Sequence, residues 1–107
     1  MAARASAHAV LVKSTPAARA ELSRPPDRVD LWFSEEIEPA WSGLSVWSAS
    51  GRRADRQDVS VPPGDPKRLS VTLGSLEPGT YTVRFRVLSV DGHVVESSFP
   101  FTVKPKP

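Results

Sequence analysis

From His8 onward, apolar and polar residues alternate with the two-residue period of strands that bury one face. The clearest run is residues 81–87, where four apolar side chains oppose Thr82, Arg84 and Arg86. The same pattern predicts further strands at residues 10–12, 29–33, 44–46, 59–61, 69–73 and 99–103, of which 59–61 is the weakest.

Turn sequences rich in proline, glycine and aspartate separate these runs. They are Pro25-Pro26-Asp27, Ser50-Gly51, Gly64-Asp65-Pro66, Pro78-Gly79 and Asp91-Gly92. Short strands at this spacing, about seven in all, predict an all-β fold, an antiparallel Greek-key sandwich. Residues 17–22 and 35–40 are expected to form short helical turns, and Pro100 requires a strand position that needs no backbone donor.

The inward side of the predicted strands defines an expected hydrophobic core. Its members are Val29, Leu31, Phe33, Leu44, Val46, Leu69, Val71, Tyr81, Val83, Phe85, Val87, Phe99 and Phe101. The chain has 107 residues, which suits a single domain built around one such core.

Composition excludes several classes of function. The net charge is +2 and the basic side chains are scattered, so the sequence predicts no nucleic-acid interface. No apolar run approaches the roughly 20 residues of a membrane-spanning helix. There is no glycine-rich phosphate loop and no marked nucleophile. Because the chain has no cysteine, any metal must be held by nitrogen and oxygen ligands.

The first seven residues end in Ala5-Ser6-Ala7, a small-x-small sequence of the kind that signal peptidase cleaves. Cleavage there would make His8 the first residue. We therefore predict that residues 1–7 are the remainder of an export signal, residues 8–103 the folded domain and residues 104–107 a linker. The alternative is that the alanine-rich start is a frayed tail.

The chain contains two histidines, His8 and His93, and the second follows Asp91 by two residues. In an extended segment this spacing puts the side chains of Asp91 and His93 on the same side. An N-terminal His8 would add its α-amine and imidazole to the imidazole of His93 and a carboxylate oxygen of Asp91. Three nitrogens and one oxygen favour Cu(II). The alternative is that Asp-Gly is an ordinary turn dipeptide and that an exposed His93 needs no function.

Several segments, in one order and spacing, resemble the CopC family of bacterial copper-resistance proteins. They are His8-Ala9, Ser14-Thr15-Pro16-Ala17, residues 29–35, Gly64-Asp65-Pro66, residues 78–87, residues 89–93 and Phe99-x-Phe101-x-Val103. The resemblance spans residues 8–103 and implies an Ig-like β-sandwich that binds one Cu(II) ion per chain. It assigns His8, Asp91 and His93 as ligands and Glu35 as a residue that orients a ligand.

The resemblance also implies a periplasmic or extracellular location and a role in copper resistance, transport or homeostasis. A CopD-type membrane protein, fused or separate, is the expected partner, and we expect the chain to be a monomer. The methionine-rich loop of some members is absent, which argues against a separate Cu(I) site.

Two other functions remain open at this point. An N-terminal His8 together with His93 is also similar to the copper brace of oxidative polysaccharide-cleaving enzymes, although about a hundred residues leave little room for a broad substrate face. A metal-free adhesion or scaffold module of the Ig type is the other alternative. A non-enzymatic copper-binding protein is the interpretation that we carry forward.

Overall fold

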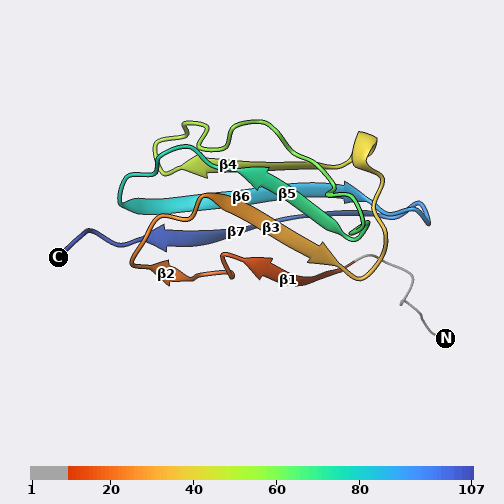
Figure 1. The fold of residues 1–107 in the computed structure, drawn as a ribbon, viewed down its shortest axis with the longest axis horizontal. Helices are drawn as coiled ribbons and strands as arrows, with labels where there is room; N and C mark the ends of the chain where they lie inside the picture. Colours follow the sequence, from red (N-terminus) through yellow and green to blue (C-terminus); the bar gives the residue numbers. More distant parts are fainter. Residues whose placement is uncertain (1–9) are drawn as a thin grey trace.

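A computed structural model describes residues 10–107 as two β-sheets packed face to face (Figure 1). The strands are β1 (Leu11–Thr15), β2 (Glu21–Leu22), β3 (Arg28–Phe33), β4 (Gly43–Ser48), β5 (Arg68–Thr72), β6 (Gly79–Leu88) and β7 (Val94–Val103). A single turn of 3₁₀ helix, η1 (Pro39–Trp41), precedes β4.

One sheet has three strands in the order β1-β3-β5, and the other has four in the order β2-β7-β6-β4. All neighbours pair antiparallel except β2, which runs parallel to the end of β7. Successive strands from β1 to β6 therefore alternate between the sheets, and β7 joins β6 in the same sheet, which confirms the predicted β-sandwich.

The predicted core is confirmed in full, since all 13 expected residues are at most 8% exposed. The core also contains Ile37, Leu73, Leu76 and Val103. The rings of Phe33 and Phe85 meet edge to face with centroids 5.5 Å apart, so they join β3 of one sheet to β6 of the other. Burying an aromatic or branched side chain of this size stabilises the fold by about 1.5–3 kcal/mol.

The expected helical turn at residues 17–22 is wrong beyond its first residues. The amide of Ala20 donates to Ala17, but Arg19 then adopts φ 65°, which a right-handed helix does not allow. The chain instead enters β2, which the alternation did not reveal because it has only two residues. In contrast, a helical turn is present near the expected residues 35–40. It is η1, which begins at Pro39 and ends at Trp41.

The weakest predicted strand, residues 59–61, is also wrong as a strand. Ser60 makes one isolated bridge to Ser70, with both N–H to C=O distances at 2.9 Å. Val59 and Val61 are partly buried against the core, which explains their alternation. Pro62 and Pro63 follow at once, and their missing amides prevent a longer ladder.

Pro100 lies within β7 opposite Thr82 of β6. Its carbonyl accepts from the amide of Arg19 on the other side of the strand, at 2.7 Å. Because the nitrogen and carbonyl of one strand residue point the same way, the proline nitrogen faces away from β6. The predicted non-bonded position is therefore confirmed.

The start of β1, the end of β3, η1 and the turn between β6 and β7 gather at one end of the sandwich (Figure 1). Backbone hydrogen bonds join these segments, including Ser34 to Val10 at 2.9 Å and Glu38 to Leu88 at 2.8 Å. Within residues 10–107, no helix has the length and apolar character needed to cross a membrane.

Candidate metal centre

The turn between β6 and β7 presents Asp91 and His93. It is closed by two backbone hydrogen bonds, from Ser89 to the His93 carbonyl at 2.8 Å and from Gly92 to the Ser89 carbonyl at 2.9 Å. Gly92 has φ +92°, a conformation that residues with a side chain rarely adopt. The Asp-Gly-His order thus suits the turn, since glycine occupies the position that requires this φ.

The structure brings Asp91 and His93 together, as their spacing predicts. The Nδ1 atom of His93 lies 3.2 Å from Oδ1 of Asp91, and the two side chains are 37% and 35% exposed. They are therefore close enough to act on one ligand, and both side chains are partly exposed, although the Nδ1 atom of His93 itself is buried. Their assignment as metal ligands stays a prediction.

The Asp91 carboxylate is held in its ionised form. The hydroxyl of Ser89 donates to its Oδ1 atom. This hydrogen bond is the largest cause of a lowered Asp91 pKa. Desolvation, the next in size, raises the pKa, and the interactions with His93 lower it further. Asp91 consequently offers a negatively charged oxygen at neutral pH, as a divalent cation requires.

The segment after β3 connects this turn to the start of β1. Ser34 and Val10 exchange two hydrogen bonds, one from the Val10 amide to Ser34 Oγ and one from the Ser34 amide to the Val10 carbonyl, both 2.9 Å. The amide of Val90 donates to the carbonyl of Glu36 at 3.0 Å. Glu35 lies between these two attachments, at the same end as the turn. Its predicted role toward a ligand stays a prediction.

The residues present fit a small nitrogen and oxygen site. With metal–ligand distances of about 2.0–2.2 Å, two neighbouring ligand atoms lie roughly 3 Å apart, close to the 3.2 Å between Asp91 and His93. Across residues 10–107 no group of three or more acidic, histidine or cysteine side chains is arranged to hold a metal. The remaining predicted ligand, His8, lies outside the described residues.

Ser89 belongs to the motif at residues 89–93, but the sequence alone did not predict a role for its side chain. Its signal was present, because Ser89 occupies the next inward position after Val87 in the alternation of β6. A serine that continues a buried row must satisfy its hydroxyl inside the protein. Here the partners are the two residues of the candidate site.

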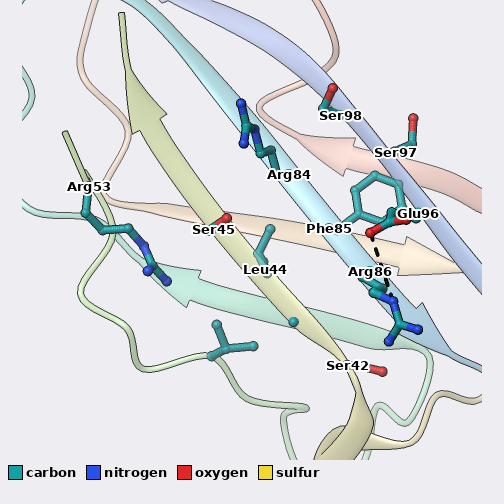
Figure 2. Close-up of a pocket in the computed structure, with 12 residues that line it drawn as sticks. Ser42, Leu44, Ser45, Arg53, Arg84, Phe85, Arg86, Glu96, Ser97 and Ser98 are labelled. Atoms are coloured by element: carbon teal, nitrogen blue, oxygen red, sulfur yellow. Dashed lines mark ion pairs between the residues drawn. The ribbon is translucent and has the colours of Figure 1, made fainter. Parts of the chain in front are cut away.

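A groove lies elsewhere, on β4, β6 and β7 (Figure 2). It has a volume of about 860 Å³, and its lining includes Arg84, Arg86, Ser45 and Ser98. Arg86 lies 4.0 Å from Glu96, a loose and exposed ion pair that contributes little. Because neither Asp91 nor His93 lines it, this groove is separate from the candidate metal centre.

Comparison with known proteins agrees with the sandwich and extends over nearly the whole chain. Residues 11–104 match the family model described as the CopC domain. The crystal structure of CopC from Methylosinus trichosporium OB3b has a TM-score of 0.86 and 35% identity, with 94% of this chain and 97% of that chain covered. Murine CRIg, at a TM-score of 0.50 and 13% identity, shows only that the fold is Ig-like.

Three curated relatives are similar in sequence. Protein YobA of Escherichia coli K12 is 38% identical over 92% of this chain and 80% of its own length. Copper resistance protein C of Pseudomonas syringae pv. tomato is 34% identical over 97% of this chain and 86% of its own length. Copper transport protein CutJ of Bacillus subtilis is 30% identical over 91% of this chain, which spans only 18% of CutJ. The chain belongs to the CopC family.

Proposed function

We propose that this chain binds one Cu(II) ion at the end of the sandwich where β1 begins. The ligands are the α-amine and imidazole of His8, the carboxylate of Asp91 and the imidazole of His93. The observation that carries the proposal is the 3.2 Å approach of Asp91 Oδ1 and His93 Nδ1 on an exposed turn. Membership of the CopC family makes the chain a binding protein rather than an enzyme.

Covalent geometry supports the participation of His8. Val10 is tied to Ser34 by two hydrogen bonds, at the same end as the Asp91 turn. Because two residues span at most about 7 Å, the short chain length before Val10 allows His8 to act at this end of the sandwich. The segment that carries Glu35 connects Val10 to the turn, which supports a role for Glu35 in orienting a ligand.

The chemistry of these groups favours oxidised copper. Three nitrogens and one oxygen suit the tetragonal geometry of Cu(II), whereas Cu(I) prefers the sulfur ligands that this chain lacks beyond Met1. Glu35, Glu36 and Glu38 add negative charge on the segment beside the turn. This charge raises the local concentration of a divalent cation.

The biological role follows from the family. We place the chain on the periplasmic or extracellular side of the membrane as a monomer of copper resistance, transport or homeostasis. Residues 1–7 are then the remainder of its export signal, residues 8–103 the copper-binding domain and residues 104–107 a linker. A CopD-type membrane protein, fused or separate, is the proposed partner. The small share of CutJ that this chain spans supports the occurrence of such domains in longer copper-transport proteins.

The test is a competition titration of Cu(II) against a chelator at neutral pH. A chain that begins at His8 is expected to bind one equivalent, and the chain that begins at Met1 to bind much more weakly, because its His8 nitrogen is a peptide amide. His93→Ala should weaken binding by at least about 10–100-fold and change the electron paramagnetic resonance spectrum. Equal affinities of the two chains would remove the α-amine from the site, and an unchanged spectrum would remove His93.

A further inference from the structure

Ser89 is a buried residue whose hydroxyl joins the two residues of the Asp91–His93 pair. It is 1% exposed and forms an isolated bridge with Ile37, which holds it against the segment after β3. A buried hydroxyl needs hydrogen-bond partners. Within residues 10–107, those of Ser89 Oγ lie on Asp91 and His93.

The hydrogen bonds of Ser89 reach a side chain and a main chain at once. Its Oγ donates to Oδ1 of Asp91 and accepts from the amide of His93 at 3.2 Å, with the His93 carbonyl at 3.3 Å. A hydroxyl has one proton, and an ionised carboxylate is the stronger acceptor. The Ser89 proton therefore goes to Asp91, while its oxygen holds the His93 backbone.

We propose that Ser89 is a positioning residue that sets Asp91 and His93 in the geometry that receives the metal. This inference rests on the proposed copper site. Without the hydroxyl, Asp91 would rotate more widely, and metal binding would have to order its side chain. Residues that orient metal ligands commonly contribute 10–100-fold to metal affinity, so we expect a loss of about 10-fold.

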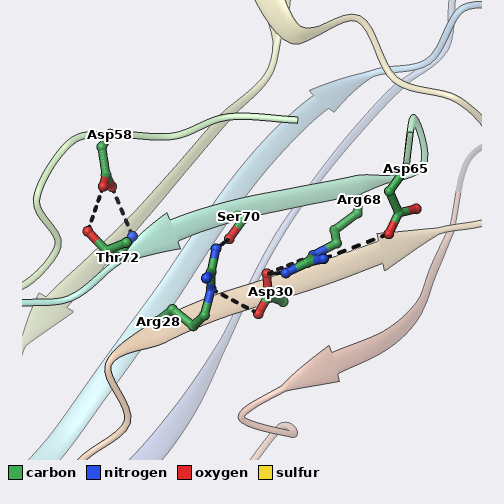
Figure 3. Close-up of polar contacts among 7 residues, drawn as sticks. All are labelled: Arg28, Asp30, Asp58, Asp65, Arg68, Ser70 and Thr72. Carbon is green, nitrogen blue, oxygen red and sulfur yellow. Dashed lines mark hydrogen bonds and ion pairs between the residues drawn. The ribbon is translucent and has the colours of Figure 1, made fainter. Parts of the chain in front are cut away.

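The chain offers a matched control in the pair formed by Thr72 and Asp58. The Thr72 hydroxyl donates to Asp58 Oδ2 at 2.6 Å, and the Thr72 amide donates to Oδ1 at 2.9 Å (Figure 3). This pair also combines a hydroxyl with an exposed carboxylate. It lies on β5 and the loop before that strand, away from the β6–β7 turn.

The experiment compares Ser89→Thr with Ser89→Val in a chain that begins at His8, which keeps every described element. Threonine and valine have nearly the same shape, so any crowding of the buried site is common to both, and only threonine keeps the hydroxyl. Cu(II) affinity is measured by chelator competition, and site geometry by electron paramagnetic resonance. Thr72→Val serves as the control, and urea unfolding shows that each variant is folded.

We expect Ser89→Val to bind Cu(II) about 10-fold more weakly than Ser89→Thr and to have an altered electron paramagnetic resonance spectrum. Thr72→Val should have the Cu(II) affinity and the spectrum of the wild type. The difference should largely disappear when Asp91→Ala is added to both, because Ser89 acts through that carboxylate. Equal affinities and spectra for the two Ser89 variants, alongside a weakened His93→Ala, would overturn this inference alone. A chain that binds no Cu(II) would overturn the proposed function together with it.

Discussion

Asp55 and Asp91 show how one residue type serves two ends of the same sandwich. The Asp55 side chain is 0% exposed and accepts three hydrogen bonds, from the amides of Val46 and Gln57, both at 2.8 Å, and from Arg53 Nε at 2.6 Å. The Asp91 side chain is 35% exposed, and its partners are a serine hydroxyl and a histidine. No arginine or lysine is paired with it among residues 10–107.

These differences in burial and in hydrogen-bond partners distinguish a carboxylate that stabilises the fold from one that can bind a ligand. Asp55 joins the loop after β4 to the edge of that strand, and its lone pairs are largely used. Asp30, 5% exposed on β3, is similar, because Arg28 and Arg68 lie within 3.3 Å of it (Figure 3). A buried carboxylate needs such partners, whereas Asp91 leaves capacity and access for a cation.

The largest expected effect tests whether the Asp55 carboxylate stabilises the fold. Asp55→Ala should lower the free energy of unfolding by about 3–5 kcal/mol, because it leaves buried donors unpaired and removes the partner of Arg53. Urea unfolding at neutral pH measures the loss, with the more exposed Asp65→Ala as the control. Copper affinity of the folded fraction should be retained. A loss confined to copper binding would mean that the two carboxylates do not differ as described.

Asp91→Ala should show the opposite pattern. Loss of a metal ligand costs at least as much as loss of a residue that orients one, so Cu(II) affinity is expected to fall at least about 10-fold. The midpoint of urea unfolding of the metal-free chain should fall only slightly, because the Asp91 side chain is partly exposed and the Ser89 hydroxyl can donate instead to the His93 carbonyl, 3.3 Å away. Chelator competition and urea unfolding of the same sample measure both quantities. A shifted midpoint with unchanged affinity would assign Asp91 to the fold.

The two regions also differ in how far the sequence predicts them. The core follows from alternation, since each inward position of β6 is apolar until Ser89. Asp91 and His93 are marked by their spacing around Gly92. Asp55 is also two residues from its partner Arg53, but its burial carries no such signal, because Val46 approaches it only when residues 52–55 fold back beside β4. Contacts formed by loops depend on tertiary packing, and for the same reason the two-residue strand β2 was missed.

Asp58 provides the smallest and most selective test, since it is an exposed carboxylate held by a hydroxyl but without a histidine. Its pKa is lowered first by the hydroxyl of Thr72 and then by the Thr72 amide. A lowered folded-state pKa stabilises the fold above the unfolded-state value, about 3.9, and this stabilisation is lost as the pH falls through the folded-state pKa.

Asp58→Asn should therefore be slightly less stable than the wild type at pH 7, and the difference should shrink as the pH falls below about 4. Urea unfolding at pH 7 and pH 3 measures it, with Asp27→Asn as the control, because that carboxylate has no hydrogen bond or ion pair among residues 10–107. Copper affinity should be unchanged, since Asp58 lies away from the β6–β7 turn. A difference that grew on acidification would reverse the sign of the linkage and show that Thr72 does not favour the ionised form. A change in copper affinity would instead show that a hydroxyl-held carboxylate binds the metal without a neighbouring histidine, and the distinction between Asp91 and the other exposed carboxylates would no longer hold.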